Sequence, residues 1–115
     1  MTEQPDLFSA EALRDAGIKA AAEHADFEIP RWTDMAMEYL IRFLAESALS
    51  STSFMGEEIR LWSHDHGLPL PPSKRAWGSV MLMASRRNLI RAISTKKVRN
   101  PKAHCANATV WVRVH

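Results

Sequence analysis

The stretch SKRAWGSVMLMASRRNLIRAI, residues 73–93, decides the fold of this 115-residue chain, because the spacing of its apolar residues changes within it. Its first part repeats apolar residues at the spacing that gathers them on one helix face, namely Trp77, Val80, Met81 and Ala84. The following residues, 89–93, are mostly apolar and include two isoleucines, a composition that favours a β-strand. The sequence therefore predicts a helix over 74–88 that leads directly into a strand.

The other face of this predicted helix is basic. It presents Lys74, Arg75, Ser79, Leu82 and Arg86 on or near the side away from the apolar stripe. Gly78 lies in the middle of the helix, where glycine costs about 1 kcal/mol relative to alanine. Two interpretations stay open for this glycine: it lets a neighbouring helix or a DNA backbone approach closely, or it is a tolerated imperfection.

Three further helices are predicted upstream. Residues 68–72 hold three prolines and form a rigid turn, preceded by a short helix that begins near Phe54 and ends at His66-Gly67. A helix from Thr33, its N-cap, to Ser47 has the strongest apolar periodicity, and the serine-rich residues 47–53 link it to the next helix. The first helix, residues 9–25, has a thin stripe made mostly of alanine, which favours docking on the domain over pairing with a second copy.

The C-terminal residues predict a β-hairpin. In residues 109–114, Val110, Val112 and Val114 alternate with Trp111 and Arg113, as in a strand with two different faces. Residues 94–108 between the two predicted strands are polar and turn-rich. This long tip carries four bases, namely Lys96, Lys97, Arg99 and Lys102.

Together these elements predict a mainly α fold with a C-terminal β-hairpin. Three helices followed by a hairpin is the order of a winged helix-turn-helix domain, here expected over residues 31–115 and preceded by an extra N-terminal helix. We expect residues 1–30 to form that acidic helix and a linker, packed on the main domain. Trp62, Trp77, Met81 and Trp111 are expected in the core, and Trp32 as a staple beneath the following helix.

Charge is divided sharply along the chain. Residues 1–65 carry five basic and thirteen acidic groups, a net charge of −8, whereas residues 66–115 carry ten basic groups and no carboxylate side chain. A segment this long in which every charged side chain is positive suggests a polyanionic partner, and duplex DNA is the first expectation. The third helix of a winged helix enters the major groove while the hairpin reaches the backbone. The predicted DNA-binding residues are therefore Lys74, Arg75, Ser79, Arg86, Lys96, Lys97, Arg99 and Lys102.

The chain also resembles a group of small, mostly uncharacterised phage and prophage proteins found among replication and recombination genes. The resemblance covers most of residues 8–114 and rests on five segments, namely Phe54-Met-Gly-Glu-Glu58, Gly67-Leu-Pro-Leu-Pro-Pro72, Arg75-Ala-Trp-Gly78, Asn88-Leu-Ile-Arg91 and the hairpin with His104-Cys105 leading to Val110-Trp-Val112. It implies a winged helix-turn-helix fold and a role near phage replication, but no biochemical activity.

Metal binding and catalysis are not expected. His64, His66, His104 and Cys105 have ligand chemistry suited to zinc, but a helical His-x-His pair points its rings apart and no Cys-x-x-Cys pair is present. Every carboxylate lies in the half opposite the expected DNA face, and the sequence has no glycine-rich phosphate loop or hydrolase motif. We therefore predict no enzyme activity, no metal and no cofactor.

The composition and the distribution of apolar residues indicate where the protein would reside in the cell. An apolar share of 46% with four tryptophans predicts one folded domain. The N-terminus lacks a basic leader followed by an apolar stretch, and no run of about 18 apolar residues occurs, so we expect a cytoplasmic protein without membrane contact. The single cysteine, Cys105, is expected buried or half-buried at the base of the hairpin tip. The chain is expected to be a monomer or homodimer.

Two functions from different classes remain compatible with the sequence. The first is a DNA-binding protein of phage or prophage type, acting in replication, recombination or transcriptional control. The alternative is a winged-helix adaptor or inhibitor that docks on a host or phage protein, such as a replication protein, through its acidic N-terminal half. The alternative is kept because DNA binding alone does not require a half with net charge −8.

Overall fold

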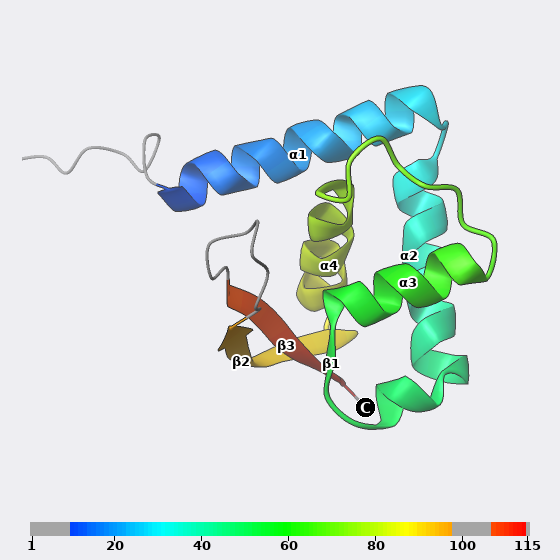
Figure 1. Ribbon diagram of the computed structural model, residues 1–115, viewed down its shortest axis with the longest axis vertical. Helices are drawn as coiled ribbons and strands as arrows, with labels where there is room; N and C mark the ends of the chain where they lie inside the picture. Colours follow the sequence, from blue (N-terminus) through cyan, green and yellow to red (C-terminus); the bar gives the residue numbers. More distant parts are fainter. Residues whose placement is uncertain (1–9, 98–106, 115) are drawn as a thin grey trace, which may run out of the picture.

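A computed structural model describes residues 10–97 and 107–114 of the chain (Figure 1). It is mainly helical with a small antiparallel sheet, which confirms the coarse prediction of helices followed by a hairpin. The elements in chain order are α1 (Ala10–Glu28), α2 (Trp32–Glu46), the short 3-10 helix η2 (Ala48–Ser51), β1 (Phe54–Met55), α3 (Gly56–Asp65), α4 (Ala76–Arg86), β2 (Ile90–Lys97) and β3 (Asn107–Arg113).

The sheet contains a strand that the sequence patterns did not predict. β3 lies between β2 and β1, antiparallel to both, so Phe54 faces Trp111 across the ladder. Phe54 was expected inside a helix, but its ring is buried and packs edge-on against Phe43 at 5.3 Å. α3 begins only at Gly56, where the Glu58 carboxylate accepts a hydrogen bond from the Met55 backbone nitrogen at 2.8 Å. This bond satisfies a donor at the helix start.

The predicted N-cap of α2 is wrong. Arg31 occupies that position in a left-handed conformation with φ of 63°, while Thr33 lies in the first turn of the helix. The Thr33 backbone nitrogen and its Oγ1 donate to the Asp26 carboxylate at 2.7 and 2.9 Å. Asp26 therefore links the end of α1 to the beginning of α2. Local capping rules do not predict this contact, because it joins two different helices.

Two other element bounds differ from the prediction. α4 begins at Ala76, because residues 73–75 form a turn in which the Ser73 carbonyl accepts from the Ala76 nitrogen at 3.1 Å. β2 continues to Lys97, opposite Asn107, so Lys96 and Lys97 belong to the strand rather than to the tip. The remaining tip residues, Arg99 and Lys102 among them, lie outside the described residues.

The core lies where α2, α3 and α4 meet the sheet. Trp32 is buried as expected, but it is the first residue of α2 rather than a staple before the helix, and its Nε1 donates to the Pro69 carbonyl at 2.8 Å. Its ring meets Trp77 edge-on at 5.5 Å. Trp77 and Met81 are buried as predicted, whereas Trp62 and Trp111 are only half-buried against the core. The other large buried side chains are Leu40, Phe43, Phe54, Ile59, Val80 and Ile90.

Arg113 is a structural residue rather than part of the basic surface. From β3 its Nη1 donates to the Leu44 carbonyl at 2.7 Å, near the C-terminus of α2, where a cation is favoured by the helix dipole. Replacing it with methionine keeps much of the apolar stem but removes the donor. We expect Arg113→Met to lower the free energy of unfolding by about 1–3 kcal/mol.

A urea titration followed by circular dichroism measures this effect. The matched control is Arg91→Met on the adjacent strand β2, where the arginine is exposed and the same substitution should change stability by less than about 0.5 kcal/mol. Equal losses for the two variants would contradict a structural role specific to Arg113.

Candidate nucleic-acid interface

The turn before α4 is held by side chains from three helices. The Leu68 nitrogen donates to the Ser63 carbonyl at 3.0 Å, and the Leu68 carbonyl lies 2.9 Å from His64 Nδ1. The Trp77 indole nitrogen donates to His64 Nε2 at 3.0 Å, so the proton of a neutral His64 resides on Nδ1. With the bond from Trp32 to Pro69, these contacts set the position of α4 relative to α2 and α3.

The predicted residues on α4 do not share one environment. Lys74 and Arg75 are exposed in the turn that precedes the helix, and Arg86 is exposed in its last turn. Ser79 is half-buried, and Leu82 is 37% exposed. The basic side chains are therefore accessible at both ends of α4, while its middle is partly occluded.

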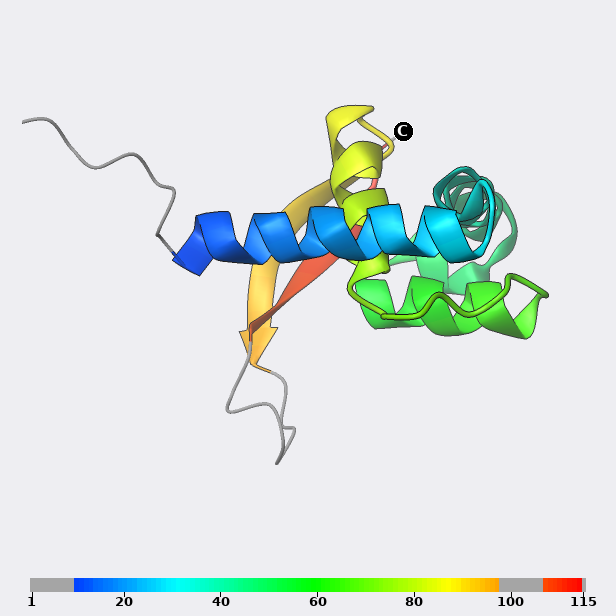
Figure 2. The ribbon, with the colours of Figure 1, turned by 90° about the horizontal axis from the view of Figure 1, so that it is seen from above.

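The occluding element is α1. In Figure 1 it runs across the end of α4 nearer the Pro-rich turn, and in Figure 2 it crosses α4 when seen from above. The two helices pack against each other. A Cβ atom added to Gly78 would lie 3.0 Å from Ile18 Cδ1, and one added to Gly17 would lie 3.1 Å from Arg75 Nη1. Of the two interpretations of Gly78, the structure favours close approach, with a helix as the neighbour.

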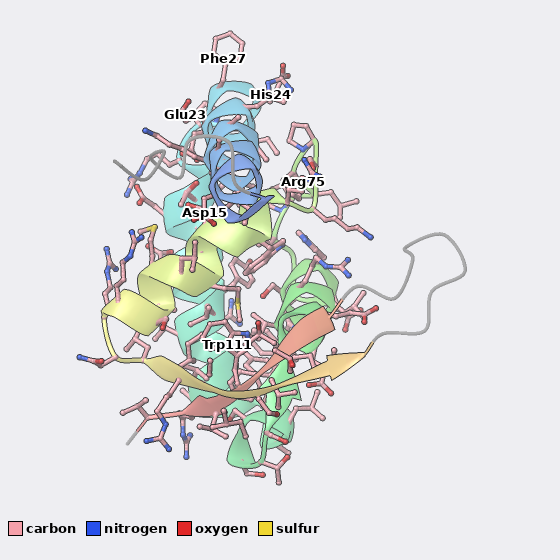
Figure 3. The ribbon with its side chains drawn as sticks, turned by 90° about the vertical axis from the view of Figure 1, so that its left-hand side faces the viewer. Asp15, Glu23, His24, Phe27, Arg75 and Trp111 are labelled. Atoms are coloured by element: carbon pink, nitrogen blue, oxygen red, sulfur yellow. The ribbon has the colours of Figure 1, made fainter. Side chains whose placement is uncertain are left out.

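A cavity separates the two helices beyond this contact. It has a volume of about 240 Å³ and lies between Asp15, Ile18 and Lys19 of α1 and four residues of α4, namely Ser79, Leu82, Met83 and Arg86. A second pocket of about 340 Å³ lies on the other side of Ile18 and Gly78, and reaches Trp111 on β3. Figure 3 shows Asp15 between α1 and α4, and Arg75 beside α1. The two helices therefore pack closely at Ile18 and Gly78, and pockets open along the same contact.

Two exposed bases were not among the residues predicted from the sequence. Arg87 follows the last residue of α4, and Arg91 lies near the start of β2. Both side chains are exposed, and with Arg86 they place three arginines within six residues. The sequence alone could have identified Arg87 and Arg91, because both belong to the ten bases of the carboxylate-free half.

Three of the five bases of the acidic half have partners within that half. Arg31 pairs with Asp34 at 3.5 Å, Arg42 with Glu46 at 3.1 Å and Arg60 with Glu57 at 3.9 Å. The hydrogen bond to Glu46 raises the pKa of the Arg42 guanidinium above its ordinary value, so this group stays charged. These ion pairs neutralise bases locally and do not extend the basic surface.

Two of the three histidines considered for zinc, His64 and His66, are engaged within the fold. Both ring nitrogens of His64 have partners, and His66 stacks on Trp62 with its Nδ1 2.7 Å from the Trp62 carbonyl. Within residues 10–97 and 107–114, no three His, Cys, Asp or Glu residues come together as a metal site. His104 and Cys105 lie outside those ranges.

In the part of the chain that the structure describes, no helix has the length and apolar character needed to cross a membrane. Comparison with protein families, with curated proteins and with solved structures finds nothing that matches this chain.

Proposed function

We propose that the chain is a winged helix-turn-helix protein of phage or prophage type that binds duplex DNA. The order of α2, β1, α3, α4, β2 and β3, with β3 between the other two strands, supports this fold assignment. In a winged helix the first short strand joins the edge of the C-terminal hairpin, as β1 does here. α1 is then an addition before the domain, and α4 takes the position of the recognition helix.

The observation that carries the proposed function is the charge of the elements that would meet DNA. The turn before α4, α4 itself and the hairpin all come from the half with ten bases and no carboxylate. Exposed bases lie at both ends of α4, and Lys96 and Lys97 end β2. A carboxylate near a phosphate would repel it, so its absence from these elements matters as much as the bases do.

The dimensions of α4 agree with this assignment. An α-helix with its side chains is about 10–12 Å across, which matches the roughly 12 Å width of the major groove of B-DNA. Lys74 and Arg75, at the N-terminal end of α4, would then reach base edges, and Lys96 and Lys97 would reach phosphates. The cellular task proposed for such a protein is replication, recombination or transcriptional control in the cytoplasm, through binding rather than catalysis.

A salt titration of DNA binding tests the proposal. If about five to seven phosphates are contacted, the logarithm of the association constant should fall with the logarithm of salt concentration at a slope of about −5 to −6. Fluorescence anisotropy of a labelled duplex, measured from about 50 to 200 mM salt, gives this slope. Binding that is absent at the low end of the range would contradict the proposal.

The adaptor function remains a second candidate because of the surface at the end of α1. Phe27 is 83% exposed there, and Asp26 and Glu28 flank it in the sequence. Figure 3 shows Phe27, Glu23 and His24 at the end of α1 away from Asp15 and from the hairpin. An exposed aromatic ring among acids is a suitable anchor for a protein partner. Failure of DNA binding at low salt would leave this candidate as the better one.

A further inference from the structure

We propose that α1 is a built-in cover on the DNA-binding face of α4 and that its N-terminal part must move aside before duplex DNA can bind. This inference rests on the proposed function and concerns the regulation of that same surface. The acidic helix α1 and the basic element α4 come from opposite halves of the charge division, yet they pack against each other.

The steric argument begins at Gly78. Three side-chain atoms of Ile18 lie 3.0–3.1 Å from the position of a Cβ on Gly78, so α1 rests directly on the backbone of α4. Ser79, one residue further, lines a cavity whose opposite wall is α1. The major groove has room for about one helix. DNA and α1 therefore cannot occupy this face of α4 together.

The two ends of α1 are held by different neighbours. Nearer its C-terminus, Ala22 and Ala25 are buried, and Asp26 is bonded to Thr33, so that end is fixed to α2. Towards the N-terminus, α1 packs on α4 through Ile18 beside Gly78, and on the turn before α4 through Gly17 beside Arg75. Two pockets line this part of α1. Glycine is a poor helix former, so Gly17 also weakens the helix at this point. The N-terminal part of α1 can thus leave α4 while the joint with α2 stays in place.

The negative charge of α1 also opposes DNA binding at this surface. Asp15 and Arg86 line the same cavity, so α1 brings a carboxylate to the surface on which a phosphate would lie. A carboxylate held near a phosphate-binding site lowers the affinity of that site for the polyanion. Binding of DNA must therefore displace both the helix and its charge.

A reversible lock between the two helices tests the inference. Ile18→Cys and Gly78→Cys, introduced together with Cys105→Ser, place two thiols within the reach of a disulfide, whose Cβ atoms are typically about 3.8 Å apart. Cysteine is also smaller than isoleucine, which makes room for the new side chain on α4. We expect the oxidised protein to bind duplex DNA at least about tenfold more weakly than the same sample after reduction.

Each result has a defined meaning. The single variant Ile18→Cys with Cys105→Ser controls for the oxidant and should bind equally in both states. Equal affinity of the oxidised and reduced double-cysteine protein would overturn the cover while leaving the DNA-binding function intact. Failure of the disulfide to form would also overturn it, because α1 would not be resting on Gly78. If no form binds duplex DNA, including Ile18→Asp in which the apolar contact is removed, both the proposed function and the cover are wrong.

Discussion

Trp32→Ala is expected to lower the free energy of unfolding by about 3–5 kcal/mol, a large part of the roughly 5–15 kcal/mol that stabilises a typical domain. The indole is fully buried between the first turn of α2 and the Pro-rich turn, and it packs edge-on against Trp77. Its removal leaves a cavity and also deprives the Pro69 carbonyl of its donor. The loss is therefore the sum of a packing term and an unsatisfied polar group.

Circular dichroism during thermal and urea unfolding measures this loss without relying on tryptophan fluorescence. Trp32→Phe separates the two contributions, because it keeps an aromatic ring but not the hydrogen bond, and should lose less stability than the alanine variant. Phe27→Ala is the matched surface control, since that ring is 83% exposed and should contribute less than about 0.5 kcal/mol. A Trp32→Ala protein as stable as the Phe27→Ala protein would contradict the assigned core.

The helices of this fold were predictable where the apolar periodicity is strong. α2 and α4 both carry a continuous stripe of large apolar residues, and both were found with errors of a few residues at their ends. β1 was missed because two residues have no period, and it is a strand only because β3 offers it an edge. The N-cap of α2 was wrongly predicted for a similar reason. Thr33 is bonded to Asp26 of α1 instead of capping α2, and Arg31 takes the N-cap position.

Within the candidate site, the sequence patterns also failed to predict the environment of the middle of α4. Exposure of Arg75 and Arg86 follows from their position relative to the apolar face of α4. The partial burial of Ser79 does not, because it depends on a second helix whose alanine-rich stripe indicates docking but not the place of docking. Gly78 was the one local signal of this contact, and the position of Ile18 beside it distinguishes between the two interpretations of that glycine.

Neutralising three bases of the proposed interface should weaken DNA binding by about 10²- to 10³-fold near 0.1 M salt. Each phosphate contact releases counterions that contribute close to one decade of affinity at that concentration, so Lys96 and Lys97 contribute nearly two decades, and loss of the base contact of Lys74 adds to them. The variant is Lys74→Gln with Lys96→Gln and Lys97→Gln, which removes charge from the turn before α4 and from the end of β2. The log-log salt slope should become shallower by about 1.8, which is about 0.9 for each of the two lost phosphate contacts.

The matched control removes the same net charge from the acidic half. Arg31, Arg42 and Arg60 are each paired with a carboxylate of that half, and their replacement with glutamine leaves the proposed interface unchanged. Surface ion pairs contribute about 0–1 kcal/mol each, so this control should also remain folded. Because both triple variants have the same total charge, general attraction between protein and DNA lowers their affinities alike. Only contact at the proposed surface predicts a large difference in salt slope, and equal slopes for the two variants would remove that surface from the DNA-binding proposal.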